Sequence, residues 1–165
     1  MNWKTLGAFA ILEAFMVMPA SRTASAHHSF AAEFDFNKPI KVTGILTRVR
    51  LVNPHGWLYM NVSDEAANSR LDPPVKGKTV EWGIEMGGAN GLYRRGWRER
   101  DLPKGATIVA EGFMAKSGAA MMNGVCITFP DGKTLFTGGS AGSDAFKGTG
   151  LAGSKPCGGQ TDTER

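Results

Sequence analysis

The sequence lacks the short motifs that mark the commonest catalytic sites. It has no Gly-rich phosphate loop, no Gly-x-Ser-x-Gly elbow, no Cys-x-x-Cys pair and no His-Glu-x-x-His helix. Carboxylates occur on expected strands at Glu81, Glu85 and Glu111, but nothing in the sequence assigns them to acid–base chemistry. These absences predict a protein that is not an enzyme.

Runs of basic residues and a second long apolar segment are also missing. The 19 Lys and Arg residues exceed the 15 Asp and Glu residues only slightly, for a formal net charge of +4. Proteins that bind nucleic acids usually carry clustered Lys and Arg, so no nucleic-acid partner is predicted. No apolar stretch after residue 26 reaches the ~20 residues that a bilayer-spanning helix requires. We therefore expect no membrane association once the N-terminal segment is removed.

The first 26 residues have the three parts of a secretory signal peptide. Lys4 supplies a positive charge, residues 6–19 are mostly apolar, and Ala24 and Ala26 occupy the small-residue positions of a cleavage site. Glu13 interrupts the apolar run, so a retained N-terminal anchor is the alternative. We expect residues 1–26 to be a signal peptide that is cleaved after Ala26 and exports the protein.

Histidines are scarce, and their positions predict a metal site. Cleavage after Ala26 makes His27 the first residue, whose α-amine and ring Nδ1 could then chelate one ion. His55, in an Asn-Pro-His turn, is expected to add a third nitrogen, and His28 either replaces His55 or stays outside the ligand set. Such nitrogen ligands suit Cu(II), with zinc as the competing ion. The alternative is that all three histidines are solvated or bonded to their own turns.

Methionines on expected strands are either soft ligands for Cu(I) or core residues; they are Met60, Met114, Met121 and Met122. A copper site at an N-terminal histidine could also activate oxygen, but that chemistry needs an open cleft that the sequence does not show. We therefore expect a non-enzymatic binding protein, with copper as its cofactor and a metal ion or small ligand as its partner.

Alternating apolar and polar residues predict a series of strands over residues 40–51, 57–62, 79–86, 107–114, 121–129 and 134–136. In the first, the apolar residues change face at Gly44, which predicts a bulge there. The third is apolar on one side only, with Val80, Trp82, Ile84 and Met86 in alternation. A short helix capped by Asn90 is expected between the third and fourth strands.

This order of elements predicts a mainly β fold, a small OB-like barrel of five or six strands with one short helix between strands 3 and 4. An immunoglobulin-like sandwich is the alternative, although it would need about seven strands and no helix. Residues 39–137 are expected to form the barrel domain. An arm over residues 27–38 would lay phenylalanines on it, and residues 138–165 would form a Gly-rich disordered tail.

The two cysteines, Cys126 and Cys157, could pair in an oxidising compartment. Such a bridge would fix the Gly-rich tail to the domain. The alternative is two unpaired thiols, because sequence does not give the distance between the sulfurs.

A cluster of aromatic and basic residues offers a second binding surface, made of Trp82, Glu85, Asn90, Arg95 and Trp97. Aromatic faces beside guanidinium groups can bind glycans or peptides by stacking and forked hydrogen bonds. The competing functional hypothesis is therefore an interaction module that recognises glycan or protein. The alternative interpretation is a helix that closes the end of the barrel, with Trp97 buried.

Several short segments carry a family resemblance: His27-His28-Ser29-Phe30-Ala31-Ala32-Glu33-Phe34-Asp35, Lys38-Pro39-Ile40, Gly44, Asn53-Pro54-His55, Trp82 with Glu85, Asn90-Gly91-Leu92, Arg95-Gly96-Trp97 and Asp131-Gly132-Lys133-Thr134-Leu135-Phe136. In these the sequence resembles family 6152 of the domains of unknown function, which are small exported proteins of Gram-negative bacteria. The resemblance implies a periplasmic location and no catalytic assignment. Gly56 and the long Gly-rich tail with Cys157 depart from the family pattern.

Overall fold

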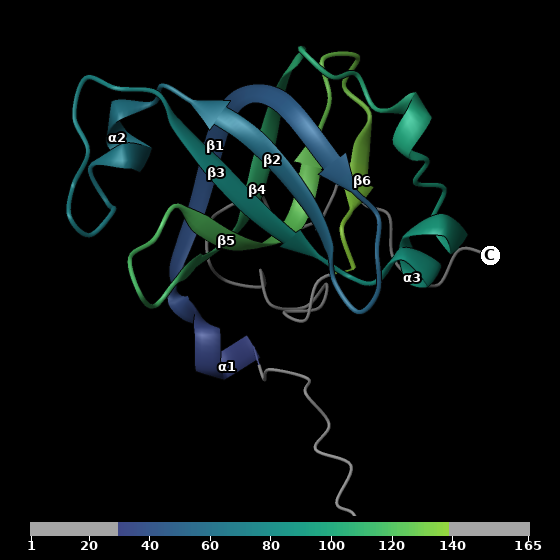
Figure 1. Ribbon diagram of the computed structural model, residues 1–165, viewed down its shortest axis with the longest axis horizontal. Coiled ribbons are helices and arrows are strands. Elements are labelled where there is room, and N and C mark those ends of the chain that lie inside the picture. Colours follow the sequence, from purple (N-terminus) through teal and green to yellow (C-terminus); the bar gives the residue numbers. More distant parts are fainter. Residues whose placement is uncertain (1–29, 139–165) are drawn as a thin grey trace, which may run out of the picture.

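The computed structural model describes residues 30–138 (Figure 1). The expected signal peptide, His27, His28, Cys157 and the tail from residue 139 lie outside these residues. The elements, in chain order, are α1 (Phe30–Glu33), β1 (Phe34–Arg50), β2 (Gly56–Val62), α2 (Glu65–Asn68), β3 (Val80–Met86), α3 (Ala89–Arg94), the 3-10 helix η1 (Glu99–Asp101), β4 (Thr107–Ala115), β5 (Met121–Thr128) and β6 (Thr134–Phe136).

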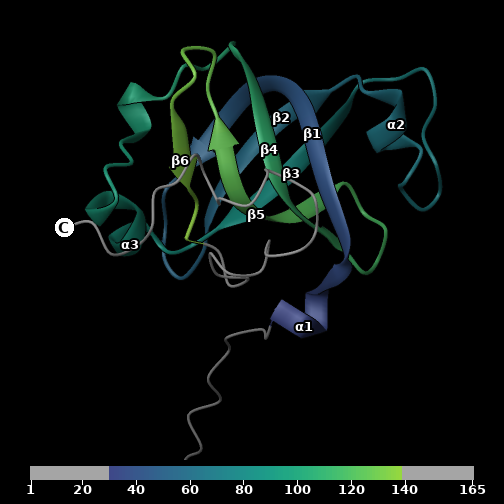
Figure 2. The ribbon, with the colours of Figure 1, turned by 180° about the vertical axis from the view of Figure 1, so that it is seen from behind.

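The fold is mainly β, as the sequence predicts, with six strands joined in one sheet and a few short helices. The strand order is β3-β2-β1-β4-β5-β6, with an additional parallel pairing between β3 and β5. Pairings followed from β1 through β2, β3, β5 and β4 therefore return to β1. β1 arches over its neighbours, and α2 and α3 lie at opposite ends of the sheet (Figures 1 and 2).

β1 is longer than predicted and changes face at a different place. Ile40, Val42 and Leu46 are buried, whereas Ile45 is 48% exposed, so the alternation continues through Gly44. The predicted bulge at Gly44 is wrong. The register against β2 shifts between Leu46 and Arg48 instead, and this irregularity returns Val49 to the core.

Gly44 is required by close packing between two strands. A Cβ at this position would collide with the backbone oxygen of Asn61 on β2 and would lie 2.9 Å from the Met60 Cε. Because a backbone oxygen cannot move aside without disturbing the sheet, β1 and β2 approach closely here only if residue 44 has no side chain.

We expect Gly44→Ala to lower the free energy of unfolding by about 1–3 kcal/mol, the usual cost of overpacking. The matched control is Gly83→Ala on β3, where the nearest atom to an added Cβ would be 3.6 Å away. Urea denaturation of both variants checks the prediction. Equal stability of the two variants would show that the contact at Gly44 is not tight.

The main core contains the alternate residues of β2 and β3 that the sequence predicted to share a face. Leu58, Met60 and Val62 are buried from β2, and Trp82 and Ile84 from β3. Trp57, Tyr59, Glu81, Gly83 and Glu85 occupy the opposite face, which we call the outer face. The predicted one-sided character of β3 is therefore confirmed, and β2 alternates in the same way.

α2 lies between β2 and β3 in the chain, and its asparagine joins the ends of these two strands. Asp64 caps the helix through the amides of Ala66 and Ala67. Asn68 is buried; its Nδ2 donates to the carbonyls of Val62 (3.0 Å) and Lys78 (3.1 Å), and its Oδ1 accepts from Trp82 Nε1 (2.9 Å). The ends of β2 and β3 are thus joined through one amide side chain.

The N-terminal phenylalanines pack against β4 rather than along an extended arm. Residues 30–33 form α1, and strand pairing already begins at Phe34. Phe30 lies 4.0 Å from Phe36 and 5.7 Å from Phe113 between ring centroids. Phe30 and Phe113 belong to an apolar cluster that is separate from the main core, whereas Phe36 is about half exposed. The described part of the expected arm is therefore a helical turn followed by β1.

Candidate functional site

The loop that carries His55 is tied to the segment that follows β3. Gly56 N donates to Gly87 O at 3.0 Å, and Ala89 N donates to Val52 O at 3.1 Å. Asn53 Oδ1 accepts a third, longer bond from Asn90 N at 3.4 Å. These bonds hold the loop before β2 against the segment between β3 and α3. The position of His55 is therefore fixed by β2 and by the residues that follow β3.

His55, Glu85 and Asn123 form a polar group at the outer face. His55 Nδ1 lies 3.1 Å from Glu85 Oε1, and Asn123 Nδ2 donates to the same oxygen at 3.2 Å. Glu85 and Asn123 are 6% and 0% exposed, whereas the His55 side chain is 26% exposed. The group therefore consists of a buried carboxylate and a buried amide, with a partly exposed histidine at its edge.

Strand register explains why these three residues meet. Glu85 on β3 is paired with Trp57 on β2 and with Asn123 on β5. Asn123 in turn lies opposite Phe113 on β4. The carboxylate is therefore flanked on one strand by an indole and on the other by an amide, and the His55 loop meets it at the end of the strands.

The arrangement controls which nitrogen of His55 can bind a ligand. A buried carboxylate is stable only where polar partners compensate for lost water, and His55 and Asn123 supply such contacts to Glu85. A carboxylate beside Nδ1 favours the tautomer whose proton is on Nδ1. Nε2 then carries the lone pair. Histidines that bind metals usually have this arrangement, with the second ring nitrogen directed at a carboxylate or carbonyl.

The structure describes only part of the predicted metal site. His55 is present, but His27 and His28 lie outside the described residues. Between residues 30 and 138, no group of three or more His, Cys, Asp and Glu side chains could hold a metal ion. Met60, Met114 and Met122 are core residues with at most 2% exposure, which is the alternative that the sequence left open for them. Met121 is partly buried and packs against the smaller apolar cluster.

The second predicted binding surface included two tryptophans that cannot contact a ligand, so this part of the prediction is wrong. Trp82 and Trp97 are both fully buried. Trp97 Nε1 donates to Phe136 O at 3.1 Å, which fixes the end of α3 to β6. Aromatic residues that make core contacts present no ring to a ligand. The alternative interpretation, a helical segment that buries Trp97, describes what is observed.

The remaining members of that surface are separated. Asn90 is exposed, but it lies inside α3 and not at its cap, which is Gly88, so the predicted capping role is wrong. Arg95 Nη1 donates to Gly91 O at 3.3 Å, and its guanidinium lies 5.4 Å from the Phe136 ring centroid. Glu85 belongs instead to the group with His55. The five residues therefore do not form one surface.

Asn123 is the residue of the polar group that sequence analysis missed. It interrupts the apolar run of β5, where its neighbours Met122 and Val125 are buried. A lone amide in such a strand is a signal that it faces a polar partner, because buried polar groups must be hydrogen-bonded. Its partner, however, lies 38 residues away and depends on the parallel β3–β5 register.

Cys126 is disulfide-bonded. It lies on β5 opposite Glu111 of β4 and belongs to the smaller apolar cluster. The other cysteine of the chain, Cys157, is outside the described residues, so the predicted pairing with Cys157 stays a prediction.

Comparison with known proteins gives a family. The model of a family described as "Family of unknown function (DUF6152)" matches residues 16–124 of the chain. The chain belongs to this family. The match includes the His27-His28 pair, the His55 turn, Glu85 and Asn123, so every residue of the polar group lies within the DUF6152 segment. No curated protein and no solved structure matches the chain.

The helices of the described region are short. None between residues 30 and 138 has the length and apolar character needed to cross a membrane.

Proposed function

We propose that this DUF6152 protein is exported to the periplasm and binds a copper ion there without catalysing a reaction. His55 Nε2 is one ligand, and the α-amine and ring of His27 are the others, if signal cleavage makes His27 the first residue. His28 is a substitute ligand or lies outside the ligand set. The observation that carries the proposal is the contact between His55 Nδ1 and the buried Glu85 carboxylate.

Copper is favoured by the donor atoms. The proposed ligands are all nitrogens, which suit the tetragonal geometry of Cu(II), and Cu(II) binds most tightly of the divalent first-row ions. Thioether sulfur would favour Cu(I), but Met60, Met114 and Met122 are in the core, and Met121, which is partly buried, packs against the apolar cluster of Phe30 and Phe113. Zinc remains the competitor, because three nitrogens and a water also form a tetrahedral site.

The proposal includes an OB-like barrel as the scaffold. Support comes from the ring of pairings through β1, β2, β3, β5 and β4, and from α3, which lies between β3 and β4 in the chain. Barrels of this type bind ligands at the outer surface of strands 2 and 3 and at neighbouring loops. His55 precedes β2 and Glu85 is on β3, so the proposed copper site would lie at that surface.

Export is supported by the sequence of residues 1–26, which has a charged start, an apolar stretch and a small-residue cleavage site. The disulfide at Cys126 agrees with this, since disulfides persist in oxidising compartments such as the periplasm.

Glu85→Gln is expected to lower the affinity for Cu(II) roughly 10–100-fold, which is the usual effect of removing the carboxylate behind a metal-binding histidine. Glutamine keeps the size of the side chain and can still accept from Asn123, but it removes the negative charge beside His55 Nδ1. Competition titration of Cu(II) against a chromophoric chelator measures the change.

The matched control is Glu81→Gln, four residues earlier on the same face of β3. Glu81 is half exposed and pairs with Arg48 at 3.4 Å, so its charge has no contact with His55. We expect its copper affinity to equal that of the unmodified protein. Equal losses in the two variants would indicate a general effect of surface charge and would refute the role of Glu85.

A further inference from the structure

Two aromatic rings lie together on the outer face, next to the polar group. Trp57 and Tyr59 of β2 stack with their ring centroids 6.2 Å apart and an angle of 22° between ring planes. Both rings cover Gly83 of β3: a Cβ at Gly83 would be 3.6 Å from Trp57 and 3.8 Å from Tyr59. Because residue 83 has no side chain, the rings can settle onto the strand backbone.

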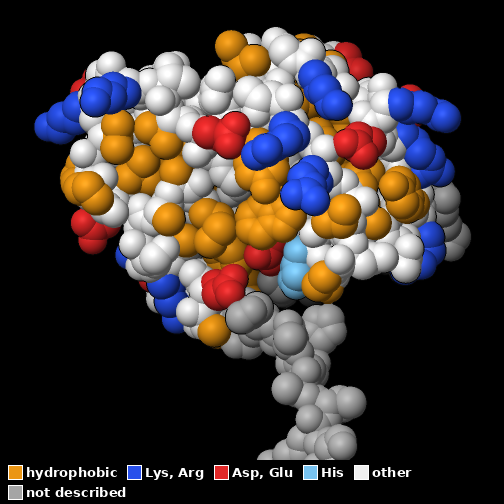
Figure 3. All heavy atoms as spheres, viewed as in Figure 1, with side chains coloured by type: hydrophobic (Ala, Val, Ile, Leu, Met, Phe, Trp, Pro, Cys, Tyr) orange, Lys and Arg blue, Asp and Glu red, His pale blue; other side chains and the backbone are white. Residues whose placement is uncertain are grey.

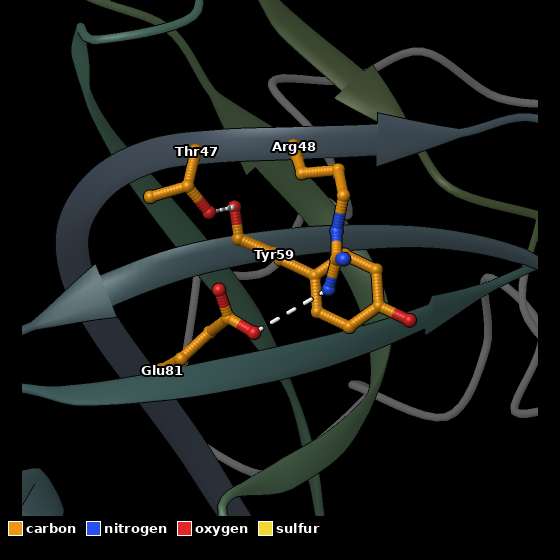
Figure 4. A network of polar contacts seen from close by, with 4 residues as sticks. All are labelled: Thr47, Arg48, Tyr59 and Glu81. Atoms are coloured by element: carbon orange, nitrogen blue, oxygen red, sulfur yellow. Dashed lines mark hydrogen bonds and ion pairs between the residues drawn. The ribbon is translucent and has the colours of Figure 1, made fainter.

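Polar side chains border this aromatic pair. The Arg48 guanidinium lies 3.9 Å from the Tyr59 ring centroid, and its Nη2 lies 3.4 Å from Glu81 Oε1 (Figure 4). Both charged side chains are about half exposed, at 53% and 50%. Figure 3 shows a band of hydrophobic side chains across this face, with basic groups above it. Donors and acceptors therefore stand beside ring faces.

A hollow of about 390 Å³ continues this face beyond Tyr59. Gly44 and the exposed Ile45 give it an apolar part, and its hydroxyl, amide and carboxylate groups come from Thr43, Asn61, Ser63, Asp64, Thr79 and Thr107. Ser63 Oγ and Thr79 Oγ1 are 2.8 Å apart. Among the described residues, no lysine or arginine lines the hollow. Such a surface can both donate to and accept from hydroxyl groups, but it does not attract anions.

We propose that this outer face, from Trp57 to the hollow at Asn61, is a binding site for a neutral oligosaccharide. The apolar faces of sugar rings stack on aromatic side chains, and their hydroxyl edges bond to groups such as those of Arg48 and Glu81. Asn61 is four positions after Trp57 along β2, about 13 Å at 3.3 Å per residue, so a short chain of sugars spans the site.

A nucleic acid or an acidic polymer fits this face less well. Each phosphate or carboxylate on such a ligand would need an uncompensated cation. Arg48 is already paired with Glu81, and Asp64 contributes a negative charge to the hollow. Arg50, which lies opposite Trp57 on β1, is exposed, but it is one cation against the many charges of such a polymer. The site uses no metal ion, so it is independent of the copper proposal.

The test is a fluorescence titration of the metal-free mature protein with cellohexaose, chitohexaose and maltohexaose, and with an acidic oligosaccharide and a single-stranded oligonucleotide. Trp57 is the reporter, since Trp82 and Trp97 are fully buried. At least one of the neutral sugars is expected to shift the emission saturably. No response to any neutral sugar, or a response only to the acidic ligands, would overturn the proposal.

Variants then locate the site by calorimetric titration with the sugar that binds. Trp57→Ala is expected to weaken binding at least tenfold and Asn61→Ala several-fold. Circular dichroism establishes that each variant is folded. Tyr93→Ala is the matched control, because Tyr93 is an exposed aromatic residue that lies on α3 and is not part of the outer face. Sugar binding that survives Trp57→Ala, or that Tyr93→Ala weakens equally, contradicts the assignment.

Discussion

Replacing His55 by alanine is expected to lower the affinity of the mature protein for Cu(II) by more than about 100-fold, since loss of a carboxylate behind such a histidine alone costs up to that factor. His55 is partly exposed at the edge of the polar group, and its Nδ1 faces Glu85 at 3.1 Å. The substitution removes the proposed ligand nitrogen and leaves the strands intact. A chelator-competition titration measures the affinity.

His28→Ala is the companion variant for this experiment. If His55 is the third nitrogen ligand, the loss of His28 changes the affinity by less than tenfold. A large loss in His28→Ala together with little change in His55→Ala would transfer the ligand role to His28, and the contact between His55 and Glu85 would then have no part in copper binding.

Replacing Trp82 by alanine is expected to lower the free energy of unfolding by about 3–5 kcal/mol, as is usual for a buried aromatic residue. Trp82 is fully buried in the main core, and its Nε1 donates to Asn68 Oδ1 at 2.9 Å. The substitution leaves a cavity and removes a partner of a buried amide. Urea denaturation measures the loss.

Trp82→Phe separates the two contributions. Phenylalanine fills most of the cavity but cannot donate, so Asn68 Oδ1 loses this bond at a cost of about 1–3 kcal/mol. The control is Trp57→Phe on the outer face, where the indole is only partly buried and stability should change little. A Trp82→Ala variant as stable as Trp57→Phe would contradict the described core and restore Trp82 as a candidate surface residue.

The strands were predictable where one face is apolar throughout. Val80, Trp82, Ile84 and Met86 alternate with polar or small residues, and β3 has the expected bounds to within one residue. β1 was harder, because Ile45 is apolar and yet exposed. An exposed isoleucine beside a glycine imitates a change of face, whereas the true irregularity, between Leu46 and Arg48, depends on pairing with β2.

The polar group was predictable only in parts. His55 was proposed as a metal ligand, but Glu85 was placed in a different surface, because a sequence does not show that a loop before β2 meets the end of β3. Asn123 joins them through the parallel pairing of β3 with β5. The arginines beside Trp97 suggested an exposed surface. Trp97 is instead buried, and its indole donates to Phe136, which is 39 residues away on β6, so the sequence around Trp97 does not show this contact.

The most direct test of the copper proposal compares two forms of the periplasmic protein, each with its N-terminus verified by mass. One begins at His27, and the other carries Gly-Ser-Gly ahead of it. Three residues are added because a histidine in the second or third position can still chelate through intervening amide nitrogens. We predict that the first form binds one equivalent of Cu(II), with a nitrogen-ligated tetragonal paramagnetic resonance spectrum, and that the extended form loses tight binding. Equal affinity in the two forms, or no stoichiometric copper in the first, would contradict the proposal.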